Sequence, residues 1–129
     1  MEIVGQVNRL TKVKPHVVIG QIHGAANDLT VYRVEGTKLW ITDGDNTHAH
    51  LVDGAFTLGK RYTLRFDVAA GKIGYTYNGV KVPYILSSSD GGAYFKAGCY
   101  AQTNPTTAPT ESTDEYHEVI VYSVKVTHA

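Results

Sequence analysis

Apolar and polar residues alternate with a period of two along almost the whole chain, and no segment sustains a helical period. Residues 60–68 show this most clearly, with apolar side chains at every second position: Tyr62, Leu64, Phe66 and Val68. Such a segment forms a strand with one buried and one solvated face, as in antiparallel sheets. We therefore predict an all-β fold, either a β-jelly roll or a concanavalin-like antiparallel β-sandwich.

Several further segments carry the same strand pattern. We predict strands at residues 17–23, 29–35, 38–42, 73–77, 80–86, 94–102 and 118–127. In the last of these, simple alternation places Ile120, Tyr122, Val124 and Val126 on one face. Asn78-Gly79 is the favoured pair for a type I′ hairpin turn. Pro83 cannot donate to a sheet ladder, so the strand that contains it either lies at an edge or ends early.

The size and charge of the chain limit its class. With 129 residues, 43% of them hydrophobic, it can build one core, so we expect a single domain over residues 1–129. Twelve basic and twelve acidic residues cancel, which argues against nucleic acid or a membrane surface as a partner. No apolar run reaches the ~18 residues of a membrane span, and the first residues lack the pattern of a signal peptide.

Three features have simple structural interpretations. The single cysteine, Cys99, is expected to be a small buried hydrophobe and not a reactive thiol. Residues 43–47 are rich in turn formers and lack the pattern of an EF-hand, so we predict a tight turn. His48 and His50 are expected on one strand face, but no third ligand follows at a suitable spacing. We therefore predict an exposed strand there, no metal and no cofactor.

Lone Trp40 and three tyrosines, Tyr32, Tyr75 and Tyr77, have two interpretations. They could stack on sugar rings, or they could simply pack well on strands. Residues 103–115 contain two prolines and no large apolar residue, which predicts an irregular mobile loop. This loop either overhangs a groove or is a connection without function.

One predicted strand has more polar side chains on its exposed face than a strand needs in order to form a β-sandwich. Residues 94–102 read Tyr-Phe-Lys-Ala-Gly-Cys-Tyr-Ala-Gln. Alternation places one set of side chains on a wet face: Tyr94, Lys96, Tyr100 and Gln102. The opposite set is expected in the core: Phe95, Ala97, Cys99 and Ala101. The wet face therefore has two phenols, an amine and an amide. This set predicts a groove that binds a polar ligand.

A second segment ends in polar side chains that point the same way, Gln21 and His23. A lone Gln-x-His is weak evidence of a site, because single histidines on strands are commonly structural. Together, however, Gln-Ile-His and the motif at residues 94–102 resemble two signature segments of alginate lyases of polysaccharide lyase family 7. The family forms are Gln-Ile/Val-His and Tyr-Phe-Lys-Ala-Gly-x-Tyr-x-Gln, and the resemblance runs from about residue 13 to 128.

The resemblance implies a jelly roll that binds alginate, an acidic polymer of mannuronate and guluronate, and cleaves it by β-elimination. By motif match, Gln21 offsets the charge of the reacting carboxylate, His23 is the base and Tyr100 is the acid. For mannuronate, Tyr100 serves as both base and acid. Lys96, Gln102 and Tyr94 match groove positions expected to contact substrate. Secretion or a periplasmic location is implied as well.

One family signature is missing. The family has an Arg-Ser/Thr-Glu-Leu-Arg strand upstream of Gln-x-His, and this chain has no such segment. We expect Arg33 to substitute for the missing arginine. The chain therefore resembles the carboxyl-terminal part of a family domain, truncated at its amino terminus, or a compact form of it. Missing strands would expose sheet edges, which a dimer or a second chain would then cover.

Other enzyme classes find no support in the sequence. There is no Gly-x-Ser-x-Gly elbow of a serine hydrolase, and no strand carries the paired carboxylates of a glycoside hydrolase. The alternative to a lyase is a carbohydrate-binding β-sandwich that keeps the groove and lacks catalysis.

Overall fold

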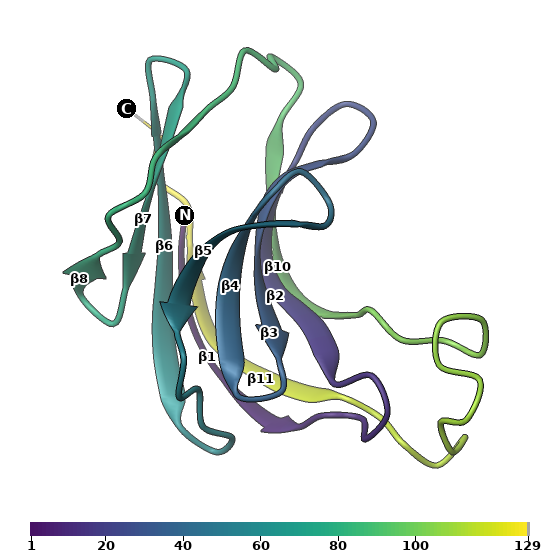
Figure 1. Ribbon diagram of the computed structural model, residues 1–129. Coiled ribbons are helices and arrows are strands. Elements are labelled where there is room, and N and C mark those ends of the chain that lie inside the picture. The colour runs from purple at the N-terminus through teal and green to yellow at the C-terminus, as the bar shows by residue number, and fades with distance from the viewer. Residues whose placement is uncertain (129) are drawn as a thin grey trace.

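The computed structural model describes residues 1–128 as a sandwich of two antiparallel sheets (Figure 1). The strands are β1 Glu2–Arg9, β2 His16–His23, β3 Asp28–Glu35, β4 Lys38–Asp43, β5 Thr47–Asp53, β6 Arg61–Ala69, β7 Lys72–Tyr77, β8 Val80–Lys81, β9 Leu86–Ser87, β10 Tyr94–Ala101 and β11 Glu118–Lys125. The predicted all-β jelly-roll sandwich is confirmed. Among the described residues there is no helix that could cross a membrane.

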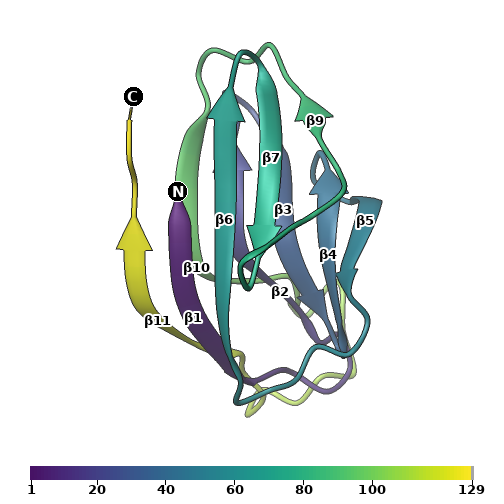
Figure 2. The same cartoon turned by 90° about the vertical axis from the view of Figure 1, so that its left-hand side faces the viewer.

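The two sheets differ in strand number and overlap incompletely. One sheet has the order β11-β1-β6-β7-β8, with β9 also paired to β7, and the other has the order β10-β2-β3-β4-β5. Figure 2 shows β11 and β1 on one side of the sandwich, with β10 behind them. Within residues 1–128, β10 and β11 each pair on one side only, so the sandwich has two neighbouring open edges.

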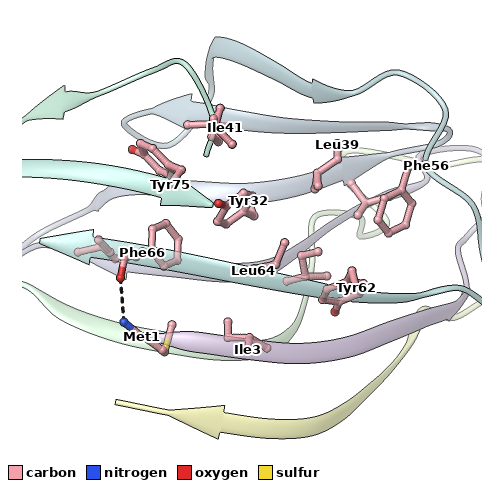
Figure 3. Close-up of a cluster of buried hydrophobic side chains, with 14 of the residues drawn as sticks. Met1, Ile3, Tyr32, Leu39, Ile41, Phe56, Tyr62, Leu64, Phe66 and Tyr75 are labelled. Carbon is pink, nitrogen blue, oxygen red and sulfur yellow. Dashed lines mark hydrogen bonds between the residues drawn. The ribbon is translucent and has the colours of Figure 1, made fainter. Parts of the chain in front are cut away.

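The core lies between the sheets and is built from the inward positions of both (Figure 3). Tyr32 and Tyr75 belong to it, which confirms that these tyrosines pack. The buried hydroxyl of Tyr75 has a hydrogen-bond partner, because it donates to Thr30 Oγ1 at 2.8 Å. The Met1 amino group donates to the Phe66 carbonyl at 2.9 Å and fastens β1 along β6 (Figure 3).

Most predicted strands are present, and the hairpin turn forms as expected. Asn78 and Gly79 both have positive φ, 49° and 80°, as a type I′ turn requires. The strand that contains Pro83 does end early, since β8 stops at Lys81. The tight turn predicted at residues 43–47 joins β4 to β5. β1 was not predicted, although Ile3 and Val7 face the core in alternation.

The predicted face of β11 is wrong. Ile120 lies opposite Gln6, on the solvent side of the sheet, whereas Val124 lies opposite the buried Ile3. A β-bulge at Tyr122 inserts one residue between them, and one extra residue reverses the side to which later side chains point. Val121 and Val124 therefore face inward.

The predicted shared face of His48 and His50 is also wrong. A register shift in the β4–β5 pair puts His48 opposite Thr42 and His50 opposite Ile41. His48 stacks on Trp40, with ring centroids 4.0 Å apart, while His50 packs near Tyr84. The two imidazoles thus point to opposite sides of the sheet and cannot share a metal ion.

The inward face of β10 is only partly buried, contrary to prediction. Phe95 packs against the core, but Ala97, Cys99 and Ala101 are exposed. The reason is the open edge, because β10 ends its sheet and only β11 lies near its inner side. Partial burial of the thiol raises the pKa of Cys99, which disfavours the reactive thiolate.

Carboxylates of the loop over residues 103–115 bind the segment around the turn between β1 and β2. Glu111 accepts a hydrogen bond from the Val13 amide at 2.9 Å, and Glu115 pairs with Arg9 at 3.3 Å. The loop therefore packs beside the turn between β1 and β2. It does not line the cavity described below.

Candidate functional site

The pairing of β2 with β10 brings the predicted side chains together on the outer face of the five-stranded sheet. Tyr94 lies directly opposite His23, and Lys96 lies directly opposite Gln21. Side chains paired in this way sit ~5 Å apart at their Cβ atoms. The rings of His23 and Tyr94 have centroids 5.2 Å apart, and Lys96 Nζ lies 5.3 Å from the centre of the Tyr94 ring.

A bulge in β10 places Tyr100. Ala97 pairs with Gly20 and Tyr100 with Val18, so Gly98 and Cys99 occupy the irregular stretch between these two pairs. Gly98 has φ +146°, a backbone conformation that other residues rarely adopt. An added Cβ would meet no atom within 4 Å, so this glycine is required for its conformation and not for space.

A cavity of about 400 Å³ opens between the paired strands and the β4–β5 turn. It is lined by Gln21, His23, Ala26, Asn27, Asp28, Asp45, Asn46, Lys96, Tyr100 and Gln102. Every predicted catalytic residue therefore borders one space, together with two of the predicted substrate-binding residues. A second cavity of about 310 Å³ lies next to it and shares Gln21, Lys96 and Tyr100.

One ring nitrogen of His23 is fixed by the backbone. His23 Nδ1 lies 2.6 Å from the Gly24 carbonyl oxygen. A carbonyl oxygen only accepts, so Nδ1 carries the proton and donates it. The neutral ring therefore has its lone pair on Nε2, and that atom is available as a base.

Gln21 is buried yet incompletely hydrogen-bonded. Its side chain is 4% exposed, and its Oε1 has no hydrogen-bond partner among residues 1–128. Buried polar atoms in native proteins nearly always have partners, and exceptions commonly mark sites that complete their bonds with a ligand. The amide also carries two donor hydrogens on Nε2, which suit a carboxylate.

Arg33 does not lie at the cavity, where it was predicted to contact the substrate. It is 5% exposed and does not line the cavity. Its Nε donates to Glu35 at 2.9 Å, and one terminal nitrogen donates to the Asp45 carbonyl at 3.2 Å. Arg33 thus holds the β4–β5 turn that forms one wall of the cavity. Its guanidinium is not free to replace the missing arginine.

Sequence reasoning missed two carboxylates at the cavity, Asp28 and Asp45. The Asp28 amide donates to Asp45 Oδ1 at 2.9 Å, so the start of β3 and the β4–β5 turn are joined there. Burial, and next the charge of Asp45, raise the pKa of Asp28 above its usual range. No motif marks these residues, because their meeting depends on the sheet register.

The remaining candidates lie outside the cavity. Tyr94 contacts His23 and Lys96 but does not line it, and Trp40 is covered on one ring face by His48. Within residues 1–128 no group of three His, Cys, Asp or Glu side chains is arranged to hold a metal ion. The cavity brings together one imidazole, one phenol, one amine, four amides and two carboxylates, and this set of groups is suited to proton transfer at a bound ligand.

Several alginate lyases of known structure share this fold. A family profile described as "Alginate lyase" matches residues 1–128. The crystal structure of the alginate lyase from Corynebacterium sp. superposes with a TM-score of 0.92 at 41% identity, covering 99% of this chain and 57% of that chain. A comparison with curated proteins finds no significant match.

Two further structures agree. Alginate lyase AlgAT5 from polysaccharide lyase family 7 gives a TM-score of 0.90 at 37% identity, covering 99% of this chain and 57% of that chain. A product complex of the family 7 alginate lyase A1-II′ gives 0.79 at 21% identity, covering 99% and 61%, and at that identity shows the fold alone. The chain thus spans less than two thirds of the length of these relatives.

Proposed function

Because this chain belongs to the alginate lyase family, we propose that it cleaves alginate by β-elimination. The bond broken is the 4-O-glycosidic bond, and the product carries an unsaturated uronate at its new end. One observation carries the proposal. His23 and Tyr100, from strands far apart in the sequence, border one cavity together with Gln21 and Lys96.

The first requirement of the reaction is charge stabilisation. Removing the C5 proton of a uronate places further negative charge next to a carboxylate, so donors and cations must offset it. The amide of Gln21 and the ammonium of Lys96 have this chemistry and lie opposite each other in the β2–β10 pair. Gln102, at the far end of the cavity wall, supplies a further amide for sugar hydroxyls.

The second requirement is a base and an acid. His23 has an unprotonated Nε2, so it can accept the C5 proton, and the electron pair of the C5–H bond moves towards the carboxyl group. As the bond from C4 to the glycosidic oxygen breaks, Tyr100 donates a proton to that oxygen. For mannuronate, whose C5 has the opposite geometry, we propose that Tyr100 serves as both base and acid.

The third feature is the absence of a free arginine at the cavity. Arg33 is bound to Glu35 and to the β4–β5 turn, so Lys96 is the cation among the lining residues. Loss of one preorganised stabiliser of charge typically lowers the rate by ~10²–10³-fold. We therefore propose that the residues described here catalyse elimination more slowly than a site with that arginine.

We further propose that the partner is the acidic polysaccharide itself and that the protein acts outside the cytoplasm, secreted or in the periplasm. A large polyuronate does not cross a membrane unaided, which supports this location. A dimer or a second chain along β10 and β11 remains our expectation for the open edges.

The proposal is tested by incubating the protein with polymannuronate and polyguluronate and following the ultraviolet absorbance of unsaturated uronate. A steady rise is expected with at least one polymer. Calorimetry with the same polymers separates the two functions. Binding with no absorbance rise would identify a carbohydrate-binding sandwich and exclude the lyase.

A further inference from the structure

Asp28 lies beside the atom of His23 that must accept the substrate proton. Asp28 Oδ1 is 3.9 Å from His23 Nε2, and the two side chains are 12% and 22% exposed. Oδ1 is buried and has no hydrogen-bond partner among residues 1–128. His23 Nδ1 is already bound to the Gly24 carbonyl, so Nε2 is the only ring nitrogen that can respond to this carboxylate.

The separation fits one protonation state of His23 better than the other. When Nε2 is unprotonated it cannot donate, so the neutral ring leaves Asp28 Oδ1 without a bond. Once Nε2 holds a proton, the ring is a cation next to a shielded carboxylate, and a charge-assisted contact forms between them. The pair therefore favours the state of His23 that exists just after proton abstraction.

We propose that Asp28 is a positioning residue for the elimination, acting through His23 as the counter-ion of the imidazolium that forms when Nε2 takes the C5 proton. This inference rests on the proposed function, because it assigns Asp28 a part in that reaction. Asp28 does not contact a reacting atom of the substrate. Its effect is to stabilise the charge that His23 gains.

The other charged groups around the pair set the sign of the effect. Asp45 accepts the hydrogen bond from the Asp28 amide and adds negative charge on the side of the β4–β5 turn. Lys96, from β10, is the neighbouring cation, and the Tyr94 ring covers His23 from the same strand. The carboxylates near the pair therefore outnumber the cations near it.

The test uses Asp28→Asn, which keeps the shape and removes the charge, with Asp114→Asn in an exposed loop as the matched control. In NMR, the His23 ring should take up its proton at a lower pH in Asp28→Asn than in the wild type, because the variant lacks the negative charge next to Nε2. With polyguluronate as substrate, the acidic limb of the pH–rate profile should also move to lower pH, and kcat should fall about tenfold with KM little changed. Asp114→Asn should match the wild type.

The outcomes separate this inference from the proposed function. If the wild type makes no unsaturated uronate, the proposed function fails, and the NMR titration still decides whether Asp28 and His23 form a pair. If Asp28→Asn titrates His23 as the wild type does and keeps its pH–rate profile, Asp28 is not the counter-ion and the inference is overturned. Asp28→Glu should restore part of the shift, which a purely structural role would not predict.

Discussion

At the scale of the residue, the roles of His23 and Tyr100 can be tested one atom at a time. His23→Ala removes the base, and Tyr100→Phe removes only a hydroxyl. On polyguluronate, each should lower kcat by ~10²-fold or more, because general acid–base catalysis typically contributes that much. Both side chains lie on the outer face of the sheet, so unfolding by urea should remain close to that of the wild type.

Matched controls exist for both substitutions. His50→Ala removes an imidazole on the other side of the sheet, and Tyr116→Phe removes an exposed phenol outside the cavity. Both controls should keep wild-type kcat. Full activity of either His23→Ala or Tyr100→Phe on polyguluronate would contradict the assigned roles.

Two histidines away from the cavity should make stability depend on pH. Burial lowers the pKa of His16 and of His117 below the usual value near 6.5. The unfolded chain then binds more protons than the folded protein as the pH falls below about 6.5, so the free energy of unfolding should decrease on acidification. The decrease amounts to at most about 1.4 kcal/mol for each proton and pH unit.

Urea unfolding at about pH 7.5 and about pH 5.5 measures this effect. His117→Gln should lose less stability between the two pH values than the wild type does, and His128→Gln should lose as much as the wild type. Equal losses in all three proteins would show that His117 does not carry the pH dependence.

Single residues also show what the sequence could predict about the site. Gln21, His23 and Lys96 border the cavity because alternation aligns them once their two strands pair, whereas Tyr100 reaches it after the bulge in β10. The same reasoning could not find Asp28, which reaches the cavity through the register of β3 against β2. Nor could it show that Glu35 and the β4–β5 turn bind the guanidinium of Arg33.

At the scale of the element, the bulge in β10 links local backbone conformation to the position of Tyr100. Gly98→Ala should destabilise the protein by about 1 kcal/mol or more, because φ +146° is unfavourable for a residue with a Cβ. It should also lower kcat, since relief of the strain shifts Tyr100. Thermal unfolding and the absorbance assay measure the two effects.

Gly91→Ala is the control for the backbone effect, because Gly91 has no positive φ and no atom within 4 Å of an added Cβ. It should leave both stability and kcat close to wild type. If Gly98→Ala behaved like Gly91→Ala, the bulge would have no part in placing Tyr100.

Elements were predictable where alternation is unbroken and unpredictable where it is interrupted. The strands around Leu64 and Tyr75 follow a plain period of two and form as expected. The bulge at Tyr122 and the register shift between His48 and His50 have no signature in one sequence, because an inserted residue changes the pairing and not the composition. Each therefore reversed a predicted face.

At the scale of the whole molecule, the open side between β10 and β11 is the main departure from a closed sandwich. Val121 and Val124 point inward from β11 yet are 40% and 49% exposed, and among residues 1–128 no strand beside β10 covers them. A strand added next to β10 would lie over this surface and pair the free backbone groups of that edge. This geometry supports the expected dimer or second chain.

Val124→Lys tests this expectation. In a lone chain the substitution should be tolerated, because the side chain is half exposed, whereas in an assembly it would place a charge in an apolar contact. Sedimentation should show that the wild type associates and that Val124→Lys associates less, with Val80→Lys on an exposed hairpin as the control. A wild type that stays monomeric at every concentration would contradict the expectation.

The central claim is that His23 and Tyr100 act on the same uronate unit. A crystal structure of Tyr100→Phe with a short alginate oligosaccharide tests this most directly, since the variant should bind substrate without cleaving it. We predict one sugar ring in the cavity, with C5 close to His23 Nε2 or to residue 100 and with its carboxylate against Gln21 and Lys96. An oligosaccharide bound on another surface, or one whose ring cannot reach both side chains, would contradict it.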